Sequence, residues 1–207
     1  MQDFLRRYPP SSSWHQSVDA YDLKEKVTDF FNVAIPEQLL NFWQTCGIGY
    51  FGKREIYVFG PPNSVTIRDD IISWNENDIF KSVFPSPERG GPLFFAETCY
   101  GEQIGFQWNN NRCLATLFIM DTFESCLLAE DFNELFEVTL SDEDFLKRDF
   151  LDELEKHVGV LQDGLWYAPI VLPLIGGSNS PSNYRIIAPK IHTIITLKLA
   201  VSLYQSN

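Results

Sequence analysis

Residues 93–129 read LFFAETCYGEQIGFQWNNNRCLATLFIMDTFESCLLA, and this stretch decides the fold. It contains four short segments that are rich in aromatic and apolar residues: Leu93–Glu97, Glu102–Trp108, Cys113–Asp121 and Phe123–Ala129. Gly101 and the asparagine run at 109–111 lie between three of them, and both are typical turn sequences. Strand-like segments joined by turns this short predict an antiparallel meander.

Two helices and a further strand are predicted before this meander. The first helix runs over about 17–31, and its apolar residues share one face: Leu23, Val27, Phe30 and Phe31. In the second helix, Pro36 suits the first turn and Gly47 can end it. Its apolar side consists of Leu39, Leu40, Phe42, Trp43 and Cys46. A strand over Arg54–Gly60 follows.

Helices are also predicted on either side of the meander. Before it, a short helix carries Ile67, Ile71, Ile72 and Trp74. After it, Asp131 and Glu134 match a capping box, and Ser141 opens a long helix. The apolar stripe of that helix consists of Leu146, Phe150, Leu154, Val158 and Leu161. Residues 195–203 alternate as a strand would, but Pro189 suits a helix start, so we predict a helix and keep a strand as the alternative.

Together these elements predict an α+β protein with N-terminal helices, a mostly antiparallel sheet and C-terminal helices packed on it. The proline- and glycine-rich segment 85–92 is the natural seam of the chain. It divides an N-terminal lobe, 1–85, from a strand-then-helix lobe, 86–207. At 207 residues, the two lobes are expected to form one compact unit.

The sequence is strongly acidic, because 28 Asp and Glu residues face 16 Lys and Arg residues, for a formal net charge of -12. Nucleic-acid binding depends on neutralising phosphates with Lys and Arg, so we predict no direct binding to nucleic acid. Anionic membranes would repel this charge as well. A basic protein partner would complement it. Solubility alone is the alternative explanation.

Neither a membrane span nor a secretory signal is predicted. No apolar run reaches the roughly 18–20 residues that a bilayer requires, and residues 1–13 lack the apolar core of a signal peptide. Cys46, Cys113 and Cys126 lie in apolar stretches, where a free thiol behaves as a small hydrophobe. We therefore predict that all four cysteines, Cys99 included, are reduced and that the protein is cytoplasmic.

One known motif is present, since residues 47–52, GIGYFG, match G-x-G-x-x-G. That motif binds a dinucleotide only when a strand precedes it and a helix follows it. Here a predicted helix ends at Cys46 and a strand is expected next. We therefore interpret the glycines as a helix stop and a turn.

The sequence shows no other recognisable catalytic or metal-binding pattern. It has no C-x-x-C pair, no G-x-S-x-G and no phosphate-binding loop, and its three histidines are far apart. We therefore predict that the protein is not an enzyme and carries no cofactor and no metal. The alternative is an unrecognised active site around Glu97, Glu102 and Asp121, which are otherwise explained as strand-end carboxylates that face water.

Residues 35–49, IPEQLLNFWQTCGIG, resemble the opening of GAD-like domains, in which a (L/I)P-x-x-L-L-x-x-W helix runs into a G-(F/I)-G turn. Residues 58–62, VFGPP, are similar to the next strand of that family and its exit. Residues 160–177, VLQDGLWYAPIVLPLIGG, match a C-terminal block of the family in order, and Asn183 followed by His192 fits the pattern. The chain departs from the family at 164–167, where GLWY replaces the acidic start of a DEMYGF box.

This resemblance covers nearly the whole chain and implies a GAD-like lobe at 1–85 and a type VI secretion-associated immunity lobe at 86–207. The layout is also similar to the SUKH superfamily. Both imply a bacterial cytoplasmic immunity protein that neutralises a cognate secreted toxin by occluding its active site or substrate groove. The expected toxin is a nuclease with a basic cleft. The alternative is a non-toxin adaptor or regulatory scaffold of SUKH-like type.

The family has no catalytic residues to carry over, and its glycine pair matches Gly176 and Gly177. These two are expected to provide a positive φ or a close backbone approach. Partner-binding residues are predicted in polar segments that are expected to be exposed. The acidic ones are Asp69, Asp70, Glu76, Asp78, Glu97 and Glu102. Trp74 is the candidate apolar anchor, with a core position as its alternative. The helix around Asp149 and Asp152 is the next candidate surface.

Overall fold

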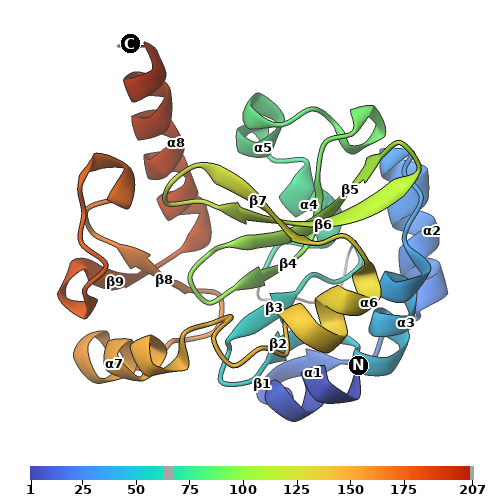
Figure 1. Ribbon diagram of the computed structural model, residues 1–207, viewed down its shortest axis with the longest axis horizontal. Coiled ribbons are helices and arrows are strands. Elements are labelled where there is room, and N and C mark those ends of the chain that lie inside the picture. The colour runs from blue at the N-terminus through green and yellow to red at the C-terminus, as the bar shows by residue number, and fades with distance from the viewer. Residues whose placement is uncertain (63–67, 206–207) are drawn as a thin grey trace.

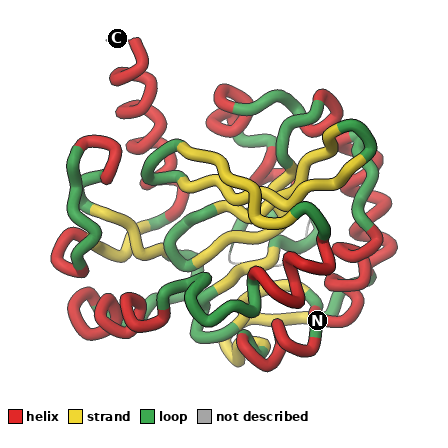
Figure 2. Tube along the Cα trace, in the orientation of Figure 1, coloured by secondary structure: helices red, strands yellow, loops and turns green. Residues whose placement is uncertain are grey.

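The computed structural model describes residues 1–62 and 68–205, and it confirms the α+β class (Figures 1 and 2). A seven-stranded antiparallel sheet lies at the centre, helices surround it, and a two-stranded sheet stands beside it. The strands are β1 (Pro10–Gln16), β2 (Ile48–Phe51), β3 (Ile56–Val58), β4 (Leu93–Thr98), β5 (Gln103–Asn109), β6 (Arg112–Ile119), β7 (Glu124–Ala129), β8 (Trp166–Pro169) and β9 (Tyr184–Ile187). The α-helices are α1 (Gln2–Arg7), α2 (Ala20–Phe31), α3 (Glu37–Cys46), α4 (Ile71–Asn75), α5 (Asp78–Val83), α6 (Phe132–Glu134), α7 (Arg148–Val158) and α8 (Pro189–Gln205).

The predicted meander is confirmed, because β4 to β7 each pair with their neighbour in the chain. The first three strands extend it in the same manner, so the whole large sheet follows chain order. The pairing of β3 with β4 crosses residue 85, and the two predicted lobes therefore share one sheet. Short turns join β2 to β3 and connect β4 to β7 in succession, and each turn returns the chain beside the strand it has just left. The β1–β2 connection is longer and contains α2 and α3, and the β3–β4 connection contains α4 and α5.

The central strand β4 is buried along its whole length because helices cover both faces of the sheet. Adjacent side chains of a strand point to opposite faces. Phe94 accordingly packs against Phe80 of α5, with ring centroids 5.0 Å apart. Phe95 packs on the other side against Phe136, in the π-helical turn Leu135–Thr139 that continues α6. The numerous phenylalanines thus fill two aromatic layers, one on each side of the sheet.

The two predicted N-terminal helices are confirmed as α2 and α3. The carboxylate of Asp19 caps α2, and Leu23, Val27 and Phe31 are buried. Phe30 was predicted on the same face but is 52% exposed, because it lies at the edge of that stripe. In α3, Trp43 is 0% exposed.

Gly47 ends α3 with φ of +78°, and strand β2 follows at once. The helix-then-strand order confirms the rejection of the dinucleotide motif. A Cβ on Gly47 would also lie 2.5 Å from the carbonyl oxygen of Gln16, so this tight helix stop requires glycine.

Three local predictions were wrong or incomplete. The long helix was expected to open at Ser141 but begins at Arg148, because Lys147 adopts a left-handed φ of +45°. The N-terminal elements α1 and β1 were not predicted. Strand β1 contains Pro10 and lies at the edge of the sheet, where a residue without an N–H is tolerated. Of the predicted middle helix, α4 carries Ile71, Ile72 and Trp74, whereas Ile67 lies outside the described residues.

The C-terminal run is a helix, as predicted. His192, Thr193, Thr196 and Ala200 form the buried side of α8, so helical spacing rather than alternation decides which side chains are covered. Strand β8 is joined to the large sheet by the backbone hydrogen bond from Tyr167 N to Cys99 O, at 2.9 Å. A second, smaller core lies here between α7 and the β8–β9 hairpin.

Candidate partner-binding surface

Two predicted partner-binding residues, Trp74 and Glu97, are each 1% exposed. The predicted exposure of Glu97 was therefore wrong, and for Trp74 the alternative of a core position is confirmed. Helix α4 lies against β4 and turns Trp74 into the aromatic layer. Its indole Nε1 donates a 2.7 Å hydrogen bond to Gln103 Oε1, which satisfies its polar atom inside the core. Neither side chain is available to a partner.

Glu97 is buried because it is paired with Arg68. The guanidinium contacts both carboxylate oxygens, with Nη1–Oε1 at 2.7 Å and Nη2–Oε2 at 2.8 Å. The same guanidinium lies 5.2 Å from the ring centroid of Trp74 and 5.3 Å from that of Trp166. Burial raises the pKa of the Glu97 carboxyl, and Arg68 opposes that shift. The Arg68–Glu97 pair is therefore part of the core and has a structural role.

The other acidic residues of the predicted segment lie at the surface, but most of them have intramolecular partners. Asp69 Oδ1 forms a 2.9 Å ion pair with Lys190 Nζ at the start of α8. The Asp70 carboxylate caps α4 by accepting hydrogen bonds from two backbone N–H groups, each at 2.9 Å. Glu76 pairs with Lys81 at 2.5 Å. Asp78, the exposed member of this segment, therefore has the carboxylate most available to a partner.

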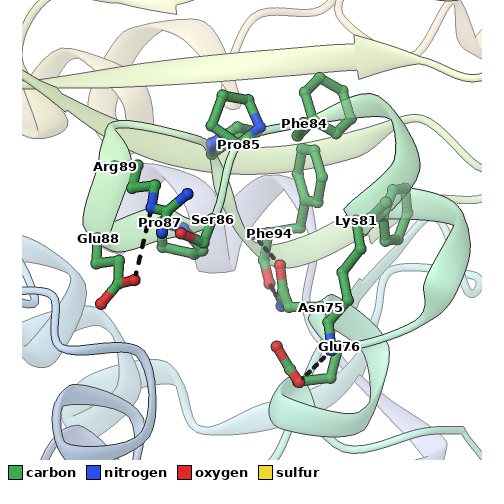
Figure 3. Close-up of a pocket in the computed structure, with 12 residues that line it drawn as sticks. Asn75, Glu76, Lys81, Phe84, Pro85, Ser86, Pro87, Glu88, Arg89 and Phe94 are labelled. Carbon is green, nitrogen blue, oxygen red and sulfur yellow. Dashed lines mark hydrogen bonds and ion pairs between the residues drawn. The ribbon is translucent and has the colours of Figure 1, made fainter.

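A pocket of about 460 Å³ opens beside this acidic segment (Figure 3). We call it the α4–α5 pocket, and its apolar lining includes Phe80, Phe84 and Phe94. The side-chain amide of Asn75 holds one wall, because it exchanges two hydrogen bonds with the backbone of Phe94, at 2.7 and 2.8 Å. Phe94 lies beyond the residues of β4 that pair with β3, where the register ends at Val58–Ala96. The Asn75 amide therefore supplies the backbone of Phe94 with the partners that a neighbouring strand would give.

The opening of the α4–α5 pocket is electrostatically balanced. The Glu76–Lys81 pair and the Glu88–Arg89 pair lie on opposite sides of it in Figure 3. A phenylalanine-lined hollow with a charged rim resembles the anatomy of protein interfaces, in which an apolar centre is surrounded by polar residues. It can receive an apolar side chain from a partner.

Helix α8 presents an exposed aliphatic face that sequence reasoning missed. Ile191, Ile194 and Ile195 are 54%, 43% and 45% exposed, and their i, i+3, i+4 spacing places them on one side. The helix extends away from the sheet in Figure 1. The available signal was that apolar residues surround the helix axis, which is typical of a helix that needs a partner on more than one side.

A second pocket, of about 330 Å³, lies where β4–β5, the end of β6 and the start of α7 meet the β8–β9 unit. We call it the Glu102 pocket. It brings together Glu102 and Asp121, two of the three carboxylates considered for an unrecognised active site, while Glu97 is in the core. Asp121 Oδ1 contacts His192 Nε2 of α8 at 2.6 Å.

The residues matched to the C-terminal motif have structural roles. Gly176 has a φ of +88°, and a Cβ on Gly177 would lie 1.8 Å from the Val171 carbonyl oxygen. The expectation of a positive φ and a close approach is therefore confirmed. The Asn183 amide closes the same loop, because it accepts a hydrogen bond from Val171 N and donates one to Val171 O.

The described residues, 1–62 and 68–205, also bear on metal ligands, membrane spans and disulfides. In that part of the chain, no group of three or more His, Cys, Asp or Glu residues is placed to hold a metal ion. No helix there has the length and apolar character to cross a bilayer. All four cysteines lie among the described residues and carry free thiols.

Comparison with known proteins gives a shared fold. No protein-family model matches the sequence. No curated protein matches it either. Among solved structures, the crystal structure of Atu4351 from Agrobacterium tumefaciens is similar, with a TM-score of 0.61 at 16% sequence identity, over 95% of this chain and 87% of that chain. At this identity the likeness shows the fold alone. The GAD-like and SUKH resemblance stays a prediction.

Proposed function

We propose that this protein is an immunity protein, which binds and neutralises a cognate secreted toxin in the bacterial cytoplasm without catalysing a reaction. The exposed isoleucine face of α8, in a chain of net charge -12, carries this proposal. The Asp69–Lys190 ion pair connects the base of α8 to the acidic α4–α5 segment, so apolar and acidic groups lie close together.

Aliphatic side chains exposed side by side are unfavourable in water and are typical of a surface that a partner covers. A partner that buries Ile191, Ile194 and Ile195 would gain apolar contact area at the centre of the interface. The acidic groups around them would contribute little affinity as isolated rim pairs, but they would steer a basic partner to this face. The partner that fits both features is a basic protein.

A nuclease is the toxin we favour. Its cleft must be positively charged to hold a phosphate backbone, and an anionic protein surface would complement that cleft. Neutralisation would then consist of occlusion, in which the immunity protein fills the substrate groove and excludes the nucleic acid. The favoured contact residues are Asp78 and the α8 isoleucines, together with the α4–α5 pocket, which would receive an apolar side chain of the toxin.

The proposal is tested with the protein encoded by the neighbouring gene. Its nuclease activity is measured while the purified immunity protein is titrated in, and cell growth is followed when the two are co-expressed. We expect complete inhibition at a 1:1 ratio and full protection of growth. A neighbouring protein that is neither bound nor inhibited would contradict the proposal, whereas binding without inhibition would favour the adaptor alternative.

Two pairs of variants locate the interface. Replacing Ile194 and Ile195 with alanine should speed dissociation about tenfold or more while leaving the melting temperature unchanged, because both side chains are exposed. The matched control replaces Val160 and Ile175, which are 64% and 46% exposed elsewhere on the surface. If both double variants dissociate at the wild-type rate, the interface does not include this face of α8.

The charge contribution is tested separately. Asp78→Lys should slow association and flatten its dependence on salt, because long-range steering acts on the association rate. Asp152→Lys, on the exposed side of α7, changes the same charge and serves as the control. A slower association of the control alone would move the acidic contact to α7.

A further inference from the structure

The Glu102 pocket differs from the α4–α5 pocket in both charge and lining. Its polar groups include the carboxylates of Glu102 and Asp121, and Tyr100, Phe150 and Tyr184 supply aromatic walls. The Phe150 ring contacts both tyrosine rings, with centroids 6.2 Å apart for Tyr100–Phe150 and 5.3 Å apart for Phe150–Tyr184. At about 330 Å³, the pocket is at the small end of ligand sites and has room for a single long side chain.

The Glu102 carboxylate retains capacity to bind a cation. Its Oε2 accepts a 3.1 Å hydrogen bond from Thr98 Oγ1. No ion pair involves Glu102 within the described part of the chain. Burial raises the pKa of this carboxyl, and the negative charge of Asp121 adds to the shift. Lys147 opposes this rise in the pKa of Glu102 only in part, because the Lys147 side chain lies at the exposed edge of the pocket.

Asp121 is the second carboxylate of this pocket. Its Oδ1 lies 2.6 Å from Nε2 of His192, whose side chain is 1% exposed, and this contact orients the carboxylate. No Lys or Arg forms an ion pair with Asp121 within the described part of the chain.

We propose that the Glu102 pocket receives an arginine side chain of the partner protein, an inference that rests on the proposed immunity function. A guanidinium suits this site better than an ammonium group, because it is planar, stacks on aromatic rings and presents several donors in one plane. Glu102 and Asp121 accept those donors, and the three rings cover the faces of the group. The pocket thereby adds a specific contact for a basic partner.

The pocket can be tested without the partner. Acetyl-arginine amide is titrated into the protein at pH 7.5, and the backbone amide signals of Tyr100, Glu102 and Asp121 are followed by NMR. We expect a saturable shift confined to the pocket. Acetyl-citrulline amide, a neutral molecule of the same shape, should give no saturable shift, and acetyl-lysine amide should bind several times more weakly. Equal binding of the citrulline compound would overturn recognition by charge, and equal binding of the lysine compound would overturn the preference for arginine.

A matched pair of variants completes the test. Glu102→Gln should weaken arginine-amide binding about tenfold or more, since it removes a charge-assisted contact but keeps an oxygen for Thr98. Glu137→Gln removes an exposed carboxylate that lines neither pocket and should leave the affinity unchanged. A thermal melt confirms that both variants fold. If Glu102→Gln binds arginine amide as the wild type does, the proposal is wrong.

The same two variants separate this inference from the proposed function. In the complex with the neighbouring toxin, Glu102→Gln should dissociate faster than Glu137→Gln. Neutralisation that both variants retain fully, without arginine-amide binding by the wild type, would refute the pocket and leave the immunity function standing. Arginine-amide binding without any neutralisation would refute the immunity function alone.

Discussion

The buried Arg68–Glu97 pair allows the most demanding test of the core. The two side chains are 4% and 2% exposed, and two contacts, at 2.7 and 2.8 Å, join them. Removing one partner from a buried ion pair leaves an uncompensated charge and typically costs about 3–5 kcal/mol. In Glu97→Gln, the rings of Tyr57, Trp74 and Trp166 still stabilise the guanidinium from 5.2–5.8 Å, so the cost should fall near the lower end, at about 3 kcal/mol.

A loss of about 3 kcal/mol in a chain of this length corresponds to a decrease of about 6–12 °C in the melting temperature. The double variant Arg68→Met/Glu97→Gln should be more stable than Glu97→Gln alone, since it buries no unpaired charge. Urea unfolding followed by tryptophan fluorescence gives the free energies of unfolding. Arg68→Met, Glu97→Gln, the double variant and the wild type together form a double-mutant cycle. A double variant that loses the sum of the two single losses would refute the coupling.

The two single variants should also respond differently to pH. In Arg68→Met, Glu97 loses its cation, and burial alone raises the pKa of its carboxyl in the folded state. Protonation of Glu97 therefore stabilises the folded state of Arg68→Met. This stabilisation is fully present below the unfolded pKa and is lost as pH rises through the folded pKa. The deficit of Arg68→Met against the wild type should therefore grow from acid to neutral pH. Glu97→Gln lacks this titrating carboxyl, whose pKa is already raised in the wild type, so its deficit against the wild type should shrink as pH rises through that pKa. A deficit of Arg68→Met that is greatest in acid would refute this account.

Three further predictions concern single sites. Trp43→Ala should cost about 3–5 kcal/mol in the free energy of unfolding, because the side chain is fully buried, and an unchanged urea midpoint would contradict that packing. Thiol titration should find four free cysteines, and exposed Cys126 should react in the native state. Burial raises the pKa of Cys46 to about 11, so Cys46 should react only on unfolding. Burial also raises the pKa of Glu102, so the stability that its proton contributes should be lost as pH rises from about 4.5 through the folded pKa. Glu102→Gln removes this titrating group, so its free energy of unfolding in urea should depend less on pH in that window. An identical pH profile for the two proteins would show that Glu102 titrates as it does in the unfolded chain.

The sequence by itself determined the local architecture. Turn residues such as Gly101 lie between strand-like segments, and the pairing of β4 to β7 follows from those short connections. Pro36 and Gly47 delimit α3 by their own backbone restrictions, which do not depend on distant residues. The glycine pair at 176–177 was identified from the family resemblance, and its constraints are local, since Gly176 adopts a positive φ and Gly177 approaches the Val171 carbonyl oxygen six residues earlier.

Only the tertiary structure decided which polar and aromatic residues remain accessible. Glu97 looked like an exposed carboxylate until the fold placed Arg68, 29 residues away, against it. Glu102 and Asp121 form one pocket only because the β4–β5 turn, the end of β6 and the start of α7 meet there. The burial of a charge depends on a partner brought from elsewhere in the chain, and no local pattern specifies that partner. The exposed face of α8 is decided in the same way, by which of its sides the rest of the molecule covers.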